Sequence, residues 1–108
     1  MSLDIDKPWQ ALSAENAGRL QGQLGVYQIA DGSGKIVYIG YAGGKSLFGL
    51  RSELEKHVGN PAKTQFRFEV NMQYQTRYRE LLMLHVLTHG ELPELNRGEQ
   101  VGRLGRLG

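Results

Sequence analysis

The chain has 108 residues, of which 40% are hydrophobic and 22% are charged, a composition typical of one folded domain and unlike a disordered or collagen-like chain. It contains no cysteine, which excludes disulfide scaffolds, thiolate zinc sites and cysteine nucleophiles. No apolar run approaches the length of a membrane span, and residues 1–9 lack the apolar stretch of a signal peptide, so we expect no membrane association and a cytoplasmic location.

The net charge of +2 arises at the end of the chain. Residues 1–96 hold ten acids and ten bases, whereas residues 97–108 hold one acid and three arginines. A protein that neutralises many phosphates of a duplex needs a broad basic surface, so this composition predicts a local or weak grip on nucleic acid. We interpret residues 97–108 as a C-terminal tail rich in Gly and Arg.

Residues 1–23 are predicted to form a helical extension that packs on the core. Ser13 is a suitable N-cap, and Leu20 and Leu24 lie on the apolar face of the short helical pattern that follows.

Three segments read as strands. Residues 25–30 and 35–40 are rich in Val, Ile and Tyr, and Asp31-Gly32-Ser33-Gly34 between them supplies the positive-φ positions of a hairpin turn, so we expect antiparallel pairing. Residues 66–72 alternate apolar and polar side chains, which indicates a strand with one buried face.

Two longer helices are expected. Residues 47–58 place apolar side chains on one helix face, with Ser46 as the cap and residues 59–61 as the stop. Residues 73–88 form a helix that becomes apolar almost all round and ends near Gly90. The predicted fold is therefore a small α/β (α+β) protein with a three-stranded, mainly antiparallel sheet flanked by helices.

The order of these elements, with Gly25-Val26-Tyr27 and Tyr38-Ile39-Gly40 on the two strands of the hairpin, resembles the GIY-YIG nuclease domain over residues 24–96. The resemblance implies an endonuclease that hydrolyses phosphodiester bonds in DNA with a single divalent ion, Mg²⁺ or Mn²⁺. It makes DNA the expected partner, with single-stranded and branched forms as candidate substrates.

The two motif tyrosines carry the central expectation. By resemblance, Tyr27 would activate or position the attacking water, and Tyr38 would hydrogen-bond the water or phosphate. A tyrosine pKa near 10 means that forming phenolate at pH 7 costs about 4 kcal/mol unless the site lowers it. The structural alternative is a cross-strand aromatic pair that stabilises the hairpin. Gly25 and Gly40 fit positions where a side chain would obstruct a neighbouring element.

Arg51 on the following helix is the expected phosphate clamp, since a guanidinium binds phosphate bidentately. Its structural alternative is an ion pair with Glu55 at i+4. The stretch between Gly40 and Arg51 is longer than the family's usual spacing, and Glu55 stands where many members have a His. His57 is about 240° from Arg51 around a helix, so it replaces that His only if the helix ends near it.

Glu80 is the expected metal ligand, because it is the only acid between Asn71 and Gly90 and one carboxylate with several waters suits Mg²⁺. The structural alternative is an ion pair of Glu80 with Arg77 or Arg51. Counted back from Pro93, the family's Glu falls nearer Leu84. The remaining substrate-binding candidates, with an Asx turn as the alternative for the last, are Lys45, His57, Arg77 and Asn96.

Two further patterns are weak. Residues 40–46 resemble a phosphate-binding P-loop but are one residue short, and His85 and His89 have the spacing of a zinc helix without a catalytic Glu or an evident third ligand. The alternative to a nuclease is a catalytically impaired GIY-YIG-like domain that binds nucleic acid or a protein partner. The nuclease requires Tyr27, Tyr38, Arg51 and Glu80 to converge on one patch.

Overall fold

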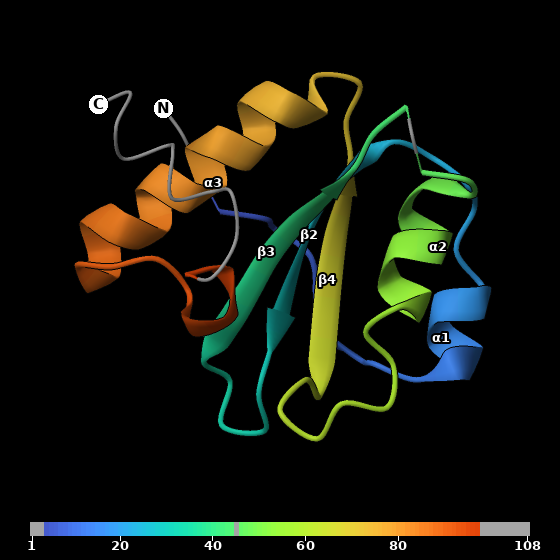
Figure 1. The fold of residues 1–108 in the computed structure, drawn as a ribbon, viewed down its shortest axis with the longest axis horizontal. Coiled ribbons are helices and arrows are strands. Elements are labelled where there is room, and N and C mark those ends of the chain that lie inside the picture. Colours follow the sequence, from blue (N-terminus) through green and yellow to red (C-terminus); the bar gives the residue numbers. More distant parts are fainter. Residues whose placement is uncertain (1–3, 45, 98–108) are drawn as a thin grey trace.

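The computed structural model describes residues 4–44 and 46–97 (Figure 1). In this part of the chain four strands form one sheet in the order β1-β4-β2-β3, and every neighbouring pair is antiparallel. The strands are β1 (Gln10–Ala11), β2 (Gly25–Ala30), β3 (Ile36–Ala42) and β4 (Gln65–Val70). The helices are α1 (Ala14–Gly18), α2 (Gly49–Glu55), α3 (Tyr74–His89) and the 3₁₀ turn η1 (Glu94–Asn96). The predicted α+β class is confirmed.

The predicted number of strands was too low. The additional strand is β1, which comes from the segment expected to be purely helical and pairs Gln10 with Phe66 and Ala11 with Gln65 on β4. The backbone N–H of Leu12 continues this contact by donating to the Thr64 carbonyl at 2.9 Å. A strand of two residues cannot display the two-residue alternation that identifies strands in a sequence, so the pattern gave no sign of it.

The hairpin of β2 and β3 forms as predicted. The Asp31 carboxylate accepts hydrogen bonds from the backbone N–H groups of Ser33 and Lys35 at 2.9 and 3.1 Å, and Gly34 has a φ of 91°. A short polar side chain and a glycine are the residues that stabilise such a turn. This turn sets the register that places Ile29 opposite Tyr38 and Tyr27 opposite Gly40.

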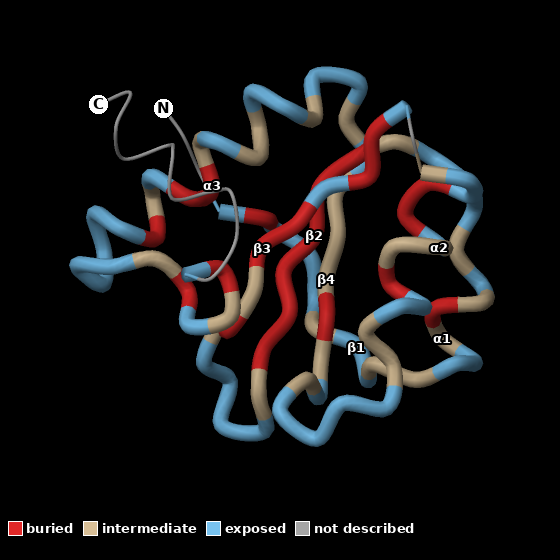
Figure 2. The backbone as a smooth tube through the Cα atoms, viewed as in Figure 1, coloured by how far each residue is buried: buried red, intermediate tan, exposed pale blue. Residues whose placement is uncertain are grey.

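Helices cover both faces of the sheet. Figure 1 shows α3 on one side and α1 with α2 on the other. One core cluster joins the sheet to α1 and α2 through Ala17, Leu50 and Leu54, and a second joins it to α3 through Leu81 and Leu82. The central strand β2 is buried along its whole length, as Figure 2 shows. Strand β3, by contrast, forms one edge of the sheet.

Helix α2 is shorter than the predicted span of 47–58. It begins at Gly49, whose φ of 56° and close approach to the backbone of Gln23 exclude a side chain there. Leu47 therefore lies outside the helix and is 82% exposed, and Ser46 does not cap it. The predicted end of α3 is confirmed, since Gly90 adopts the left-handed conformation with a φ of 84°.

The N-terminal segment is tied to the core, as the predicted extension requires. The Ser13 hydroxyl caps α1 by accepting the Asn16 N–H at 3.1 Å. On the α3 face Ile5 is buried, Asp4 pairs with Arg67 at 3.2 Å, and the Arg67 guanidinium lies 4.4 Å from the centre of the Trp9 ring. The predicted tail lies, apart from Arg97, outside the described residues. Within the described residues, no helix combines the length and apolarity needed to cross a membrane.

Candidate functional site: a tyrosine-lined cleft at the sheet edge

The two motif tyrosines lie together on the face of the sheet that α2 covers. Their ring centroids are 6.1 Å apart, and Tyr27 is almost completely buried in the core cluster beneath α2. Gly40, which pairs with Tyr27 across the hairpin, makes this possible, because a Cβ at Gly40 would overlap the Tyr27 ring and hydroxyl. A Cβ at Gly25 would overlap the Glu69 carbonyl in the same way. Both glycines thus have the close neighbours expected of them.

His57 joins the tyrosine pair. Its Nε2 atom lies 3.0 Å from the Tyr27 hydroxyl oxygen, and its ring centroid is 5.0 Å from that of Tyr38. Helix α2 ends at Glu55 with Lys56 as its C-cap, so His57 lies outside the helix. A continued helix would have pointed its side chain away from this face. The condition for His57 to approach the site, an early end of this helix, is therefore met.

The protonation of His57 follows from its surroundings. Burial, with the nearby Lys63 ammonium as the next cause, lowers the pKa of His57 to about 4, so the ring is neutral at pH 7. The Lys63 Nζ atom lies 2.6 Å from Nδ1. An ammonium can only donate, so Nδ1 accepts, which assigns the ring proton to Nε2 and makes the Tyr27 oxygen the acceptor of the His57 N–H. The result is a Lys63–His57–Tyr27 chain of hydrogen bonds.

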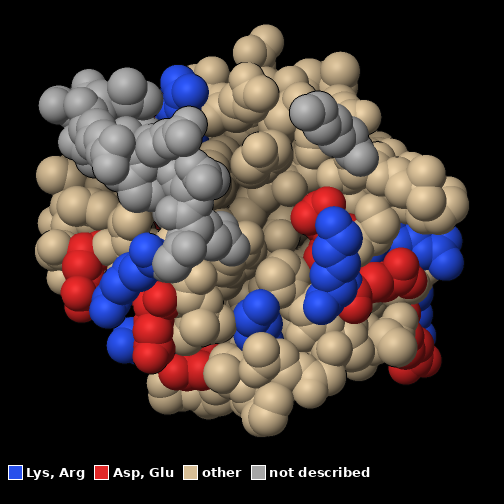
Figure 3. Space-filling view, in the orientation of Figure 1, with Lys and Arg blue, Asp and Glu red and all other residues tan. Residues whose placement is uncertain are grey.

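A cleft of about 520 Å³ opens beside the pair, along the edge strand β3. Figure 3 shows the surface hollowed between the α3 side and the α2 side, with a floor made mostly of uncharged residues. The α2 side contributes Ser46, Glu53 and Lys56. The sequence contains five tyrosines, and all five line this cleft: Tyr27, Tyr38, Tyr41, Tyr74 and Tyr78.

The charged groups on the α2 side are already paired with one another. The Lys56 Nζ atom lies 3.1 Å from a Glu53 carboxylate oxygen, and the Ser46 hydroxyl donates to the same oxygen at 2.9 Å. Lys56 remains largely exposed in this pair, whereas the Glu53 side chain is 18% exposed. A ligand anion in the cleft would meet the exposed ammonium more readily than the carboxylate.

Arg51 does not line the cleft. It extends along α2 and pairs with Glu55 at 3.6 Å, with about half of each side chain exposed. The structural alternative for Arg51 is thus the observed contact, and Lys56, the C-cap of α2, lines the cleft where Arg51 does not.

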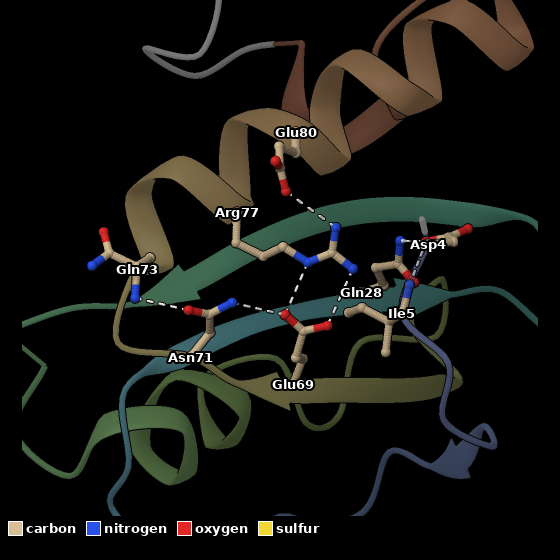
Figure 4. A network of polar contacts seen from close by, with 8 residues as sticks. All are labelled: Asp4, Ile5, Gln28, Glu69, Asn71, Gln73, Arg77 and Glu80. Carbon is tan, nitrogen blue, oxygen red and sulfur yellow. Dashed lines mark hydrogen bonds and ion pairs between the residues drawn. The ribbon is translucent and has the colours of Figure 1, made fainter. Parts of the chain in front are cut away.

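Glu80 lies on the other side of the sheet, within the polar network of Figure 4. Its carboxylate pairs with Arg77 at 3.3 Å, and Arg77 also binds Glu69 on β4 through two hydrogen bonds of 2.9 and 3.1 Å. Tyr78 faces the cleft, and a residue two positions later is turned by about 200° around a helix. Glu80 therefore faces away from the tyrosines.

This placement means that the residues present do not fit a metal held by Glu80 beside Tyr27 and Tyr38. The polar side chain that α3 does present to the cleft is Gln75, which has no carboxylate. Within residues 4–44 and 46–97, no group of three or more His, Asp or Glu side chains is arranged to hold a metal ion.

Arg77 and Asn96, two of the substrate-binding candidates, make contacts within the fold. The Arg77 side chain is only 12% exposed and is bonded to Glu69. Burial alone would raise the pKa of Glu69, but hydrogen bonds from Arg77 and Asn71 lower this pKa below its usual value. Asn96 is completely buried, and its amide exchanges two hydrogen bonds of 2.9 Å with the backbone N–H and C=O of Ile39. Lys45, the last substrate-binding candidate, lies outside the described residues.

The two weak patterns gain no support. Strand β3 continues to Ala42, so the P-loop-like segment begins inside a strand. The rings of His85 and His89 are 4.3 Å apart, but Nδ1 of His85 is bonded to the Glu91 carbonyl at 2.9 Å.

Sequence reasoning missed most of the cleft wall on the α3 side. Tyr74 and Tyr78 pack against the second core cluster while their rings also face the cleft. Tyr41 lies beyond the predicted strand 35–40 but within the observed β3, and it contacts both of these rings. The available signal was the spacing of Tyr74 and Tyr78, which places both on one side of a helix.

The fold and the cleft define a small α+β protein with an antiparallel sheet and a polar, tyrosine-lined cleft on its edge strand. The chain belongs to the family described as a domain of unknown function (DUF7508), which matches residues 1–87. The match includes the N-terminal extension together with most of the predicted core domain. No curated protein and no solved structure matches the chain significantly.

Proposed function

We propose that this protein is a GIY-YIG-like domain that binds nucleic acid, with a backbone phosphate held in the tyrosine-lined cleft. One observation carries the proposal: Tyr27 and Tyr38, the tyrosines of the hairpin motifs, lie together at a cleft that also presents the exposed Lys56 ammonium. Hydroxyl and ammonium groups are common donors to phosphate oxygens, and such contacts position a nucleic acid without reading its sequence.

The proposal favours binding without metal-assisted hydrolysis. The nuclease expectation needs Arg51 and Glu80 beside the tyrosines, and neither lines the cleft. Arg51 is paired with Glu55, and Glu80 is paired with Arg77 on the opposite face of the sheet. Among the described residues that line the cleft, the cation is Lys56, which would contact a phosphate as a point charge. Few phosphates are neutralised by such a site, so we expect weak binding with a shallow salt dependence.

Phosphodiester hydrolysis at the same cleft is a second candidate, favoured by the Lys63–His57–Tyr27 chain. The His57 N–H at 3.0 Å, itself bonded to the Lys63 ammonium, fixes the Tyr27 hydroxyl oxygen beside the cleft. An oxygen held in this way would position an attacking water next to a bound phosphodiester.

Binding is tested by fluorescence anisotropy with labelled oligonucleotides. Lys56→Ala should weaken binding by about 1 kcal/mol, which is about fivefold, because one charge-assisted contact is lost. Lys35→Ala is the matched control, since Lys35 is an exposed lysine of the hairpin turn that does not line the cleft. Equal affinities of wild type, Lys56→Ala and Lys35→Ala would contradict a phosphate at this cleft.

Hydrolysis is tested on the same oligonucleotides with Mg²⁺ or Mn²⁺ added. We expect no cleavage above that of a Glu80→Gln variant, because Glu80 does not face the cleft. Cleavage that is abolished in Tyr27→Phe would establish the second candidate in place of the first. Circular dichroism of each variant confirms that the fold is retained.

A further inference from the structure

The α3 side of the cleft is an aromatic wall formed by Tyr41, Tyr74 and Tyr78. The rings of Tyr41 and Tyr74 are stacked, with centroids 5.7 Å apart and an angle of 16° between their planes. The rings of Tyr41 and Tyr78 are 4.8 Å apart and tilted by 55°. Tyr41 is 42% exposed, so a ligand can reach its ring. Tyr74 and Tyr78, which contact this ring, are partly buried against the core and hold it in place.

The backbone of the loop after β3 is adapted to this wall. A Cβ at Gly43 would lie 2.8 Å from a ring carbon of Tyr74, so a glycine is needed for the loop to pass the ring. The N–H of Gly44 approaches the Tyr74 hydroxyl oxygen at 3.4 Å. The aromatic wall is thus held by contacts on both sides, which lowers the entropy lost when a ligand binds to it.

The opposite wall of the cleft is polar. It holds the Lys56 ammonium, the Glu53 carboxylate to which Lys56 and the Ser46 hydroxyl are bonded, and the motif tyrosines, all lining the same volume of about 520 Å³. Pockets of roughly 300–1,000 Å³ typically hold one small molecule or one such group of a larger ligand. A nucleotide combines the two chemistries that these walls match, because its base has an apolar π-face and its phosphate is an anion.

We propose that the cleft binds an unpaired nucleotide, with the base against the Tyr41 side and the phosphate toward Lys56. The inference rests on the proposed function and adds the form of the nucleic acid. Bases inside a duplex are stacked on their neighbours and offer no free face, whereas an unpaired base stacks on aromatic side chains with little regard to sequence. Single strands, loops and frayed ends therefore fit the cleft, and a continuous duplex does not.

The experiment compares single-stranded and duplex oligonucleotides of about 12 nucleotides, within the usual site sizes of single-strand binding domains. Single-stranded DNA and RNA of the same pyrimidine sequence form separate arms, which identify the source of the nucleotide. We expect either single strand to bind more tightly than the blunt duplex. Tyr41→Leu should reduce single-strand affinity at least about fivefold, because it removes the π-face. Tyr41→Phe, the matched control, should stay within about twofold since the ring is kept.

Three results would overturn the inference. Equal binding of duplex and single strands, unchanged in Tyr41→Leu but weakened in Lys56→Ala, would leave the proposed function standing without the unpaired base. An equal loss in Tyr41→Phe and Tyr41→Leu would assign the effect to the hydroxyl instead of the ring. Absence of binding to every oligonucleotide would remove the proposed function and the inference together. Tyr41→Leu also loses the ring contacts with Tyr74 and Tyr78, so thermal unfolding is measured for both variants and the affinities are compared per folded molecule.

Discussion

Replacing Asn96 tests whether this residue supports the fold or contacts a substrate. Its side-chain carbonyl accepts the Ile39 N–H and its amide donates to the Ile39 carbonyl, both at 2.9 Å and fully buried. Ile39 lies in β3, the edge strand, and within residues 4–44 and 46–97 no further strand satisfies its outward backbone groups. At Ile39 the Asn96 side chain supplies the two hydrogen bonds that a neighbouring strand would make.

The expected loss can be worked out from these two bonds. Asn96→Ala removes both partners of Ile39 and leaves a buried donor and a buried acceptor, each costing about 1–3 kcal/mol. Partial entry of water reduces this cost, so we expect the free energy of unfolding to fall by about 2–4 kcal/mol. For a domain of this size such a change lowers the melting temperature by roughly 10–25 °C.

Urea unfolding followed by circular dichroism measures this loss of stability. Fluorescence anisotropy measures the oligonucleotide affinity of the protein that remains folded. Asn60→Ala is the control, because the Asn60 side chain only accepts the N–H of Ala62 in an exposed turn. Asn96→Ala should lose stability and, per folded molecule, retain its affinity for oligonucleotides. A variant as stable as Asn60→Ala that no longer binds would refute the structural role and return Asn96 to the substrate-binding residues.

Two further predictions concern the tyrosine pair. Gly40→Ala should lower the free energy of unfolding by about 1–3 kcal/mol, because the new methyl group would overlap the Tyr27 ring. Gly44→Ala is the control, since no atom lies near the added carbon and the free energy of unfolding should change little. Equal urea midpoints for the two variants would show that the position of the Tyr27 ring does not depend on Gly40. The folded pKa of His57, about 4, lies below the usual value of 6.5, so the unfolded chain binds more protons between these values and stability falls as the pH is lowered from 6.5 to 4. His57→Gln should remove about 1–2 kcal/mol of that pH dependence, a value that allows for the partial exposure of the ring. The measurement is urea unfolding at several pH values, and identical profiles for wild type and His57→Gln would contradict a buried neutral imidazole.

The sequence contained enough information for the hairpin and for the ends of several elements. Alternation of side chains, the Asp31–Gly34 turn and the stop at Gly90 are local signals, and each corresponds to a contact or a backbone angle in the structure. Strand β1 had no such signal, because its two residues owe their conformation to pairing with β4. Sequence patterns therefore predicted the elements that contacts between residues close in sequence determine, and not the strand that depends on a distant partner.

The candidate site was predicted only where its geometry follows from strand pairing. Tyr27 and Tyr38 share a face because the register of the hairpin requires it. The direction of Glu80 depends instead on how α3 rotates against the sheet, which the burial of Leu81 and Leu82 determines. Those two residues point to the sheet and Tyr78 points to the cleft, so the carboxylate of Glu80 is left on the side of Arg77 and Glu69. The sequence motif does not specify this rotation, so it left the ion pair with Arg77 open as an alternative to a place beside the tyrosines.

The position of the cleft follows from β3 being an edge strand. Successive side chains of a strand point to opposite faces, so Tyr38 reaches the α2 side and Tyr41 reaches the α3 side. In a central strand, neighbouring strands would separate these two sides completely. At an edge the two sides meet, and helices from opposite faces can enclose one volume with tyrosines from both. Asn96 occupies this edge at Ile39, and the cleft extends along the strand end that leads into Gly43 and Gly44. The same edge thus supplies buried hydrogen bonds that stabilise the fold and, a few residues later, the two unlike walls of the proposed nucleotide site.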